Sequence, residues 1–221
     1  MNIKKLTYLL LLIPALSFGQ GKLNVIVIPY TPTSGKVTWS VDIDDLTTSS
    51  NLGGQGLFVT REGTLRVNSE GGYNVINPAN SAAFSACYYN LTLANDQFCA
   101  GTITALDQWA WVGPGVRWST TANTGYYVYS STAETALVRR VDGVDTELAT
   151  GDVISTNDEL ELRIVGYELQ VYVNGSLHTS LDTDGKYTDS SGDKIASGYN
   201  AIIGMGNSTS ADMIDPEGGA L

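Results

Sequence analysis

The chain has 221 residues, of which 43% are hydrophobic, and its 12 Lys and Arg stand against 23 Asp and Glu, a formal net charge of −11. This acidic balance disfavours nucleic acid and anionic lipid as partners, because both carry negative charge. The 24 glycines, with plentiful Thr, Ser and Asn, favour many short strands and tight turns over helices.

The start of the chain predicts an export signal. Lys4 and Lys5 precede the apolar run Leu6–Leu16, and small residues follow before a cut that leaves Gln20 first. The run is too short to span a membrane, and no later stretch predicts insertion. A buried N-terminal helix is the alternative. We therefore expect residues 1–19 to be a signal peptide and 20–221 to be a single domain that is secreted, periplasmic or held at the cell surface.

The first part of the mature chain predicts strands separated by polar connections. In the stretch 36–43, Val37 and Trp39 alternate with polar residues, which is the period of a half-buried strand. Two apolar runs within 56–67 flank a turn at Gly63, a pattern typical of a hairpin. Further strands are expected at 22–29 and 82–89, with a loop at 68–80.

The middle of the chain continues this pattern. Gly113-Pro114-Gly115 indicates a break before the next strand, and Asp142-Gly143 suits the positive φ angles of a type I′ turn. The expected strands are 96–106, 116–118, 126–130, 137–141 and 144–149.

The clearest strand pattern lies at 159–175. Leu160, Leu162 and Ile164 alternate with charged residues, and a second alternating run follows a glycine-containing turn. Asn174-Gly175 then predicts another type I′ turn and a third strand at 176–181. A three-stranded meander with one apolar face needs a second sheet to cover that face.

The whole pattern predicts an all-β fold. A long acidic loop at 182–198 precedes a strand at 199–205, and the tail 211–221 either pairs with an N-terminal strand or frays. About twelve to fourteen strands without a convincing helix favour a two-sheet antiparallel β-sandwich of the jelly-roll type.

The order of these pieces resembles the concanavalin A-like lectin/glucanase superfamily. The segments are DQFCAGTITAL, GPGVRWS, NTGYYVY, GDVISTNDELELRIVGYELQVYVNG and SGYNAIIGMG, within 56–219. The resemblance is to laminin-G-like and glucanase-like modules of secreted bacterial and phage proteins, and the V-N-G turn and G-V-R strand are its most specific parts. It implies a convex and a concave sheet. Such modules commonly bind carbohydrate, sometimes with calcium at the rim.

The sequence favours binding over catalysis. The glucanase branch uses Glu-x-Asp-x-x-Glu or Glu-x-Asp-x-Glu, since retaining hydrolysis needs two carboxylates about 5 Å apart. Asp42 and Asp44, and likewise Glu159 and Glu161, have the i, i+2 spacing but no third acid in register, and we interpret them as solvated. The single histidine, His178, leaves no credible Ser-His-Asp set.

Outward-facing aromatic and arginine side chains form the candidate carbohydrate site. Sugars stack on aromatic rings while polar groups bind their hydroxyls. If Val116 and Val128 face the core, strand alternation predicts a single outward platform made of Arg117, Tyr127, Tyr129, Arg163 and Tyr172. The alternative is that tyrosines simply favour strands. All four tryptophans, Trp39, Trp109, Trp111 and Trp118, are expected in the core.

Two further features concern metal binding and cysteine chemistry. The acidic loop supplies oxygen ligands suited to calcium, although a solvated loop is the alternative and the spacing is not that of an EF-hand. The candidates are Asp182, Asp184, Asp189 and Asp193. In an exported protein, Cys87 and Cys99 predict one disulfide, with two buried thiols as the alternative.

We therefore expect a secreted, non-catalytic, laminin-G-like carbohydrate-binding module whose partner is a glycan or cell-surface polysaccharide. The first alternative is a structural or adhesive component of a surface or virion, which would use the sandwich as a spacer and contact other proteins. A glycan hydrolase or lyase is the less favoured alternative.

Overall fold

A computed structural model describes residues 38–41, 51–54, 58–70, 73–91, 93–207 and 211–221, which all belong to the compact unit Thr33–Leu221. The predicted signal peptide and the strand predicted at 22–29 lie outside the described residues. Within the described ranges, no helix is long and apolar enough to cross a membrane.

The described residues form fifteen strands and one short 3-10 turn, η2 (Leu52–Gly54). The strands are β1 (Thr38–Ser40), β2 (Phe58–Glu62), β3 (Leu65–Glu70), β4 (Tyr73–Tyr89), β5 (Gln97–Ala105), β6 (Trp111–Trp118), β7 (Gly125–Ser130), β8 (Thr135–Val141), β9 (Val144–Gly151), β10 (Asp158–Val165), β11 (Glu168–Val173), β12 (Ser176–Leu177), β13 (Lys186–Thr188), β14 (Tyr199–Asn207) and β15 (Asp212–Ala220).

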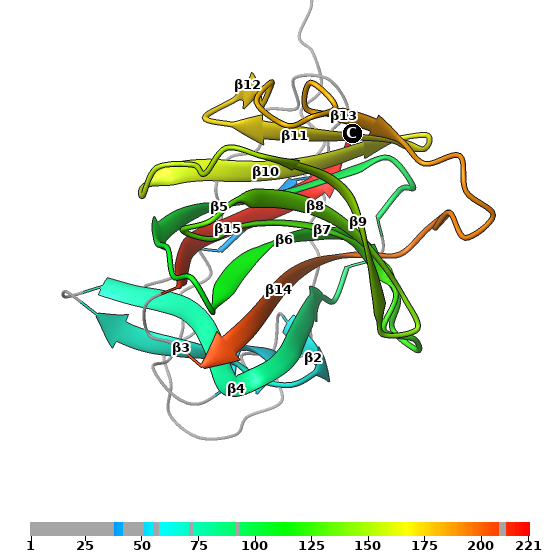
Figure 1. Ribbon diagram of the computed structural model, residues 1–221. Helices are drawn as coiled ribbons and strands as arrows, with labels where there is room; N and C mark the ends of the chain where they lie inside the picture. Colours follow the sequence, from blue (N-terminus) through cyan, green and yellow to red (C-terminus); the bar gives the residue numbers. More distant parts are fainter. Residues whose placement is uncertain (1–37, 42–50, 55–57, 71–72, 92, 208–210) are drawn as a thin grey trace, which may run out of the picture. The chain divides into compact units, whose positions relative to one another are not determined.

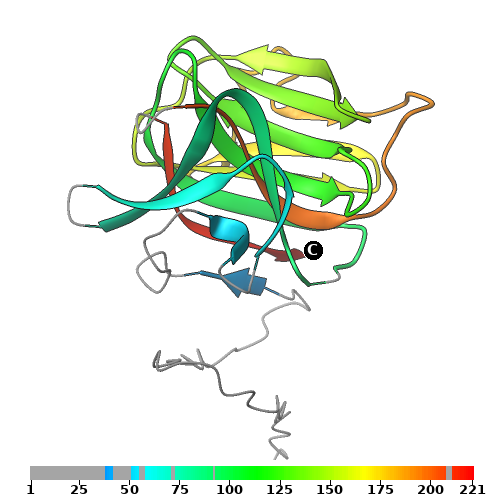
Figure 2. The same ribbon diagram turned by 90° about the horizontal axis from the view of Figure 1, so that it is seen from below.

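The strands make two antiparallel sheets (Figures 1 and 2). The back sheet has the order β12-β11-β10-β5-β15-β4, with β13 beside β11, β1 beside β15 and β3 beside β4. The front sheet has the order β4-β14-β6-β7-β8-β9, with β2 beside β4. The long strand β4 belongs to both, since its first residues pair with β3 and β15 and its last with β2 and β14. The predicted two-sheet antiparallel sandwich is confirmed.

The core between the sheets is built from the predicted alternation. Leu160, Leu162 and Ile164 on β10 have no exposed surface, and Val116 and Val128 of the front sheet face them within the same cluster. Burying a side chain of this size stabilises the fold by about 1.5–3 kcal/mol. The strand register predicted for 159–165 is therefore confirmed.

The two predicted type I′ turns are also confirmed. Asp142 and Gly143 have φ of 48° and 84°, and Asn174 and Gly175 have 49° and 73°. The strand after the second turn is shorter than predicted. It ends at Leu177 because Leu181 N donates to His178 O and the chain turns into the long loop. The tail forms β15 and pairs with β1, which is one of the two alternatives predicted for it.

Three predictions in the region of 56–118 are wrong. β2 and β3 are not a hairpin, because each pairs with a different part of β4 and the chain turns from one sheet to the other at Gly63, whose φ is 58°. β4 runs through much of the predicted loop at 68–80. β6 runs through Gly113-Pro114-Gly115 without a break. A Cβ at Gly113 would lie 2.0 Å from the Val128 oxygen, so this glycine serves the close approach of β7 rather than a turn.

The predicted disulfide is not formed, and both cysteines are free and buried. Cys87 pairs with Ile202 in the front sheet, whereas Cys99 pairs with Leu162 in the back sheet. Packed sheets lie about 10 Å apart, which exceeds the Cα separation of about 4.4–6.8 Å that a disulfide spans. Burial raises the pKa of Cys87 to about 11 and that of Cys99 to about 12.

Candidate functional site

The five residues predicted to form one platform lie in three different places. Arg163 and Tyr172 are on the outer face of the back sheet, where the Arg163 guanidinium lies 4.0 Å from the Tyr172 ring centroid. Arg163 Nη2 also donates to Glu161 Oε2 at 2.8 Å. Glu161 was predicted to be solvated, but its side chain is only 8% exposed because Arg163 pairs with it. The ring and both charges are thus already engaged with one another.

Tyr127 and Tyr129 lie on the outer face of the front sheet, in a second aromatic cluster. Trp111 stacks on both, with ring centroids 5.3 Å from Tyr127 and 4.4 Å from Tyr129. Phe84 and Trp118 complete the cluster and stack on each other at 5.7 Å. The predicted outward orientation of both tyrosines is therefore correct, but the face they share is crowded.

This outer face of the front sheet is strongly concave. Phe84 is on β4 and Arg140 is on β8, four strand spacings away, which is about 19 Å in a flat sheet. The Arg140 guanidinium nevertheless lies 3.8 Å from the Phe84 ring centroid. The sheet is curved so strongly that side chains from strands on opposite flanks of this face meet above the strands between them. Tyr127 is consequently only 2% exposed and has no free ring face for a sugar, and burial raises the pKa of its hydroxyl.

One aromatic ring stands free beside this concave face. Trp109, in the loop between β5 and β6, is 79% exposed. The loop is held in place, since Asp107 Oδ1 accepts from Trp109 N at 2.7 Å and from Ala110 N at 3.1 Å. Thr132 N also donates to Asp107 O at 3.2 Å, which joins this loop to the β7–β8 turn. The indole is therefore presented to solvent from a fixed backbone.

Three carboxylates lie around the half-buried Tyr129 on the same face, Glu134 in the β7–β8 turn and Asp145 and Glu147 farther along β9. The Tyr129 hydroxyl donates to Glu134 Oε1 at 3.1 Å. Asp145 and Glu147, both on the exposed edge strand β9, lie opposite Arg140 and Val138 on this face. Burial, and then the negative charges of Glu134, Glu147 and Asp145, raise the pKa of Tyr129. We call the set Trp109, Tyr129, Glu134, Asp145 and Glu147 the concave rim.

Arg117 takes a different position from the one predicted, and it is only 1% exposed. Its φ is 52°, so the strand alternation on which the prediction rested ends at this residue. Its guanidinium donates to the backbone oxygens of Asn95 at 2.8 Å, Ile195 at 2.8 Å and Gly166 at 2.6 Å. It thereby joins three separate loops at the end of β6.

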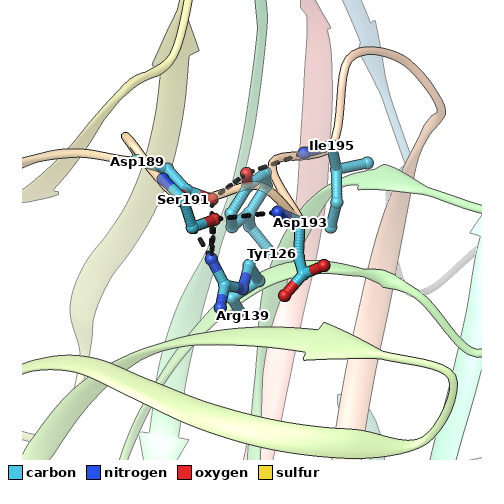
Figure 3. A network of polar contacts seen from close by, with 6 residues as sticks. All are labelled: Tyr126, Arg139, Asp189, Ser191, Asp193 and Ile195. Carbon is cyan, nitrogen blue, oxygen red and sulfur yellow. Dashed lines mark hydrogen bonds and ion pairs between the residues drawn. The ribbon is translucent and has the colours of Figure 1, made fainter.

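The four aspartates predicted as calcium ligands do not form one site. Asp189 is buried, where its carboxylate accepts from Arg139 Nη1 at 3.0 Å and from the Tyr126 hydroxyl at 2.6 Å (Figure 3). Asp193 is exposed, and its carboxylate points away from Asp189 in Figure 3. Asp182 and Asp184 are exposed as well. Within the described ranges, no group of three or more His, Cys, Asp or Glu could hold a metal ion.

Sequence reasoning missed Trp109, which was expected in the core with the other three tryptophans. Trp39, Trp111 and Trp118 are indeed buried. Asp107, two residues earlier, is the signal that could have distinguished Trp109 from the buried tryptophans. An Asp side chain that accepts hydrogen bonds from backbone N–H groups two and three residues later is typical of a turn. A turn there removes Trp109 from the strand pattern.

The two-sheet sandwich agrees with the fold that the sequence resemblance implied, and several solved structures share it. No family model and no curated protein matches the chain. Among solved structures, it is similar to the carbohydrate-binding module CBM66 from Bacillus subtilis, with 15% identity, a TM-score of 0.55, and coverage of 77% of this chain and 95% of the other.

Two further solved structures have the same fold at low identity. The Ca²⁺-bound exoplasmic/lumenal domain of VIP36 has 11% identity and a TM-score of 0.56, over 82% of this chain and 90% of the other. A Bacillus licheniformis β-glucanase has 9% identity and a TM-score of 0.51, over 86% of this chain and 100% of the other.

Proposed function

We propose that this chain is a secreted, non-catalytic carbohydrate-binding module that holds a glycan at the concave rim. The observation that carries the proposal is Trp109, a tryptophan 79% exposed on a loop fixed by hydrogen bonds. Burying an aromatic side chain contributes about 1.5–3 kcal/mol, so a ring left in solvent gains that stabilisation only when a ligand covers it. The flat C–H face of a sugar is such a ligand.

The neighbouring polar groups favour a neutral glycan. Glu134, Asp145 and Glu147 offer carboxylate oxygens, which accept hydrogen bonds from sugar hydroxyls. The same charges, together with the net charge of −11, repel uronic or sulfated chains. Among the structures of similar fold are a carbohydrate-binding module and the VIP36 domain solved with Man3GlcNAc bound, which support this proposal at the level of fold.

Binding is a better account of these acids than hydrolysis. Glycoside hydrolysis requires a general acid that stays protonated next to a second, ionised carboxylate. Asp145 and Glu147 are two residues apart on one strand face, yet both are exposed, and Asp145 Oδ2 lies 2.6 Å from Arg140 Nη1. Both carboxylates are open to solvent and one is already engaged with an arginine, whereas the general acid of such a hydrolase lies in a shielded, apolar site.

The test is a glycan array followed by titration calorimetry on wild type and Trp109→Ala. We expect at least one neutral oligosaccharide to bind and the variant to bind it about tenfold more weakly, which corresponds to about 1.4 kcal/mol. Val165→Ala is the matched control, because Val165 is also an exposed apolar residue, 46% exposed, but lies on the back sheet. If wild type binds no glycan, the role of structural spacer becomes the better account. If it binds one and Trp109→Ala binds as well as Val165→Ala, the glycan is not held at the concave rim.

A further inference from the structure

A pocket lies at the other end of the sandwich from Trp109. Trp109 follows β5 and precedes β6, whereas Asp96 precedes β5 and Arg117 is near the end of β6. The pocket has a volume of about 450 Å³, and its lining includes Asp96, Arg117, Tyr167 and Leu221, which is the end marked C in Figure 1. This volume is within the range of about 300–1,000 Å³ typical of small-molecule sites.

Arg117 gives this pocket a positive charge in a fixed position. A guanidinium has five N–H donors, and three of these bind the backbone oxygens of three loops. Nη1 and Nη2 each keep a second N–H for which the described residues offer no acceptor at hydrogen-bond distance. Asp96 Oδ1 lies 3.7 Å from Nη2, which is an ion pair but longer than a hydrogen bond.

Asp96 supplies an acceptor beside those donors. Its Oδ1 accepts from Gly166 N at 2.8 Å, and its side chain is 45% exposed. Its second carboxylate oxygen receives no hydrogen bond from the described residues. Arg117 and Asp96, which each keep hydrogen-bonding capacity that the described residues do not use, therefore both line the pocket as an ion pair.

We propose that this pocket binds a neutral sugar residue through two adjacent hydroxyl groups. A hydroxyl both donates and accepts, so one hydroxyl donates to Asp96 while the pair accepts from Arg117. A carboxylate or phosphate would also accept from Arg117, but Asp96 would repel it. The negative charge of Asp96 therefore selects a diol over an anion.

Tyr167 provides the apolar contact that this ligand needs. Its half-buried ring lines the pocket, with the Arg117 guanidinium 5.5 Å and the Lys194 ammonium 4.7 Å from the ring centroid. Lys194 is exposed, so its ammonium can move into solvent without breaking a buried contact. The sugar's C–H face can then lie against the ring. This pocket shares no residue with the concave rim, so the two proposals can fail independently.

The test uses methyl glycosides of glucose, galactose and mannose, the fully O-methylated form of each, and methyl glucuronide. Binding is followed by NMR through the Gly166 amide and the Arg117 Nε–H, which both lie at the pocket. We expect saturable shifts with at least one neutral glycoside, at least fivefold weaker binding of methyl glucuronide, and none with the O-methylated forms. In Asp96→Asn, which keeps the acceptor for Gly166, the neutral glycoside should bind at least fivefold more weakly and methyl glucuronide more tightly than in wild type.

Tyr167→Ala should weaken neutral binding without unfolding the loops, because Arg117 holds them through backbone oxygens. Trp109→Ala is the control and should leave the pocket shifts unchanged. The proposal is overturned if no neutral glycoside gives saturable shifts, or if Asp96→Asn and Tyr167→Ala bind as wild type does. It is equally overturned if only Trp109→Ala loses binding, an outcome that would support the concave rim.

Discussion

The buried ion pair between Asp189 and Arg139 should stabilise the long loop between β12 and β14. Asp189→Ala removes a side chain with no exposed surface and leaves the Arg139 guanidinium, 10% exposed, without its charge partner. Breaking a buried pair in this way costs about 3–5 kcal/mol. The Tyr126 hydroxyl also loses its acceptor, a loss that overlaps with the first because all three groups form one network. We expect a total loss of about 3–5 kcal/mol in the free energy of unfolding.

Urea denaturation at pH 7 measures this loss, and thermal melting provides a second reading. For a chain of this length, 1 kcal/mol shifts Tm by about 2–4 °C, so Asp189→Ala should lower Tm by about 6–20 °C. Asp193→Ala is the matched control in the same loop. Asp193 is exposed, and its loss should change stability by less than about 0.5 kcal/mol.

Replacing both partners tests whether the loss comes from an uncompensated charge. Arg139→Met combined with Asp189→Leu should recover much of the stability, since apolar residues of similar volume often replace a buried pair without loss. If Asp189→Ala and Asp193→Ala were equally stable, or if the double variant were no better than Asp189→Ala, the network in Figure 3 would not be what holds this loop.

Three other predictions follow from the fold. Burial alone would raise the pKa of Asp189, but hydrogen bonds from Ser191, Tyr126 and Arg139 outweigh it and hold that pKa below the ordinary 3.8. The stabilisation from the ionised carboxylate should therefore be complete above about pH 4 and fade as pH falls through the lowered pKa. In urea, the stability gap between wild type and Asp189→Asn should close in acid, and a gap independent of pH would contradict this. Leu162→Asp buries an unpaired charge in the core and should lower the free energy of unfolding by more than about 4 kcal/mol. Glu161→Gln should lower it by less, and equal urea midpoints for the two variants would mean that the strand register is wrong. A thiol reagent should label neither Cys87 nor Cys99 in the folded protein but both in denaturant, and the intact mass should lack the 2 Da loss that a disulfide causes. Labelling of the folded protein would show that the thiols are accessible.

The parts of this fold that can be predicted from the sequence are those that residues close together in the chain determine. The alternation of Leu160, Leu162 and Ile164 fixes which face of β10 is buried, and Asn174-Gly175 fixes the turn that follows, because period and turn chemistry are local properties. Pairing partners are not local. Gly63 is suited to a hairpin turn and to a corner between sheets, and only the later strand β4 decides between them.

The candidate site was harder to predict for the same reason. Alternation correctly placed Tyr127 and Tyr129 outward, but it carries no information about curvature, which brings Phe84 against Tyr127. Arg117 left the pattern at a positive φ, and Trp109 left it at a turn capped by Asp107. Each of these depends on contacts between segments that are distant in sequence or on a single departure from regular backbone.

The way Arg117 joins its three loops has a consequence for how the pocket can vary. Its partners are main-chain oxygens of residues 95, 166 and 195, and every amino acid carries such an oxygen. Substitutions on these loops can therefore change the shape and polarity of the pocket wall while the same guanidinium keeps the loops together. Related chains that keep this arginine could differ widely in ligand yet share one loop framework, and libraries randomised at Asn95, Tyr167 and Ala196 would be expected to stay folded.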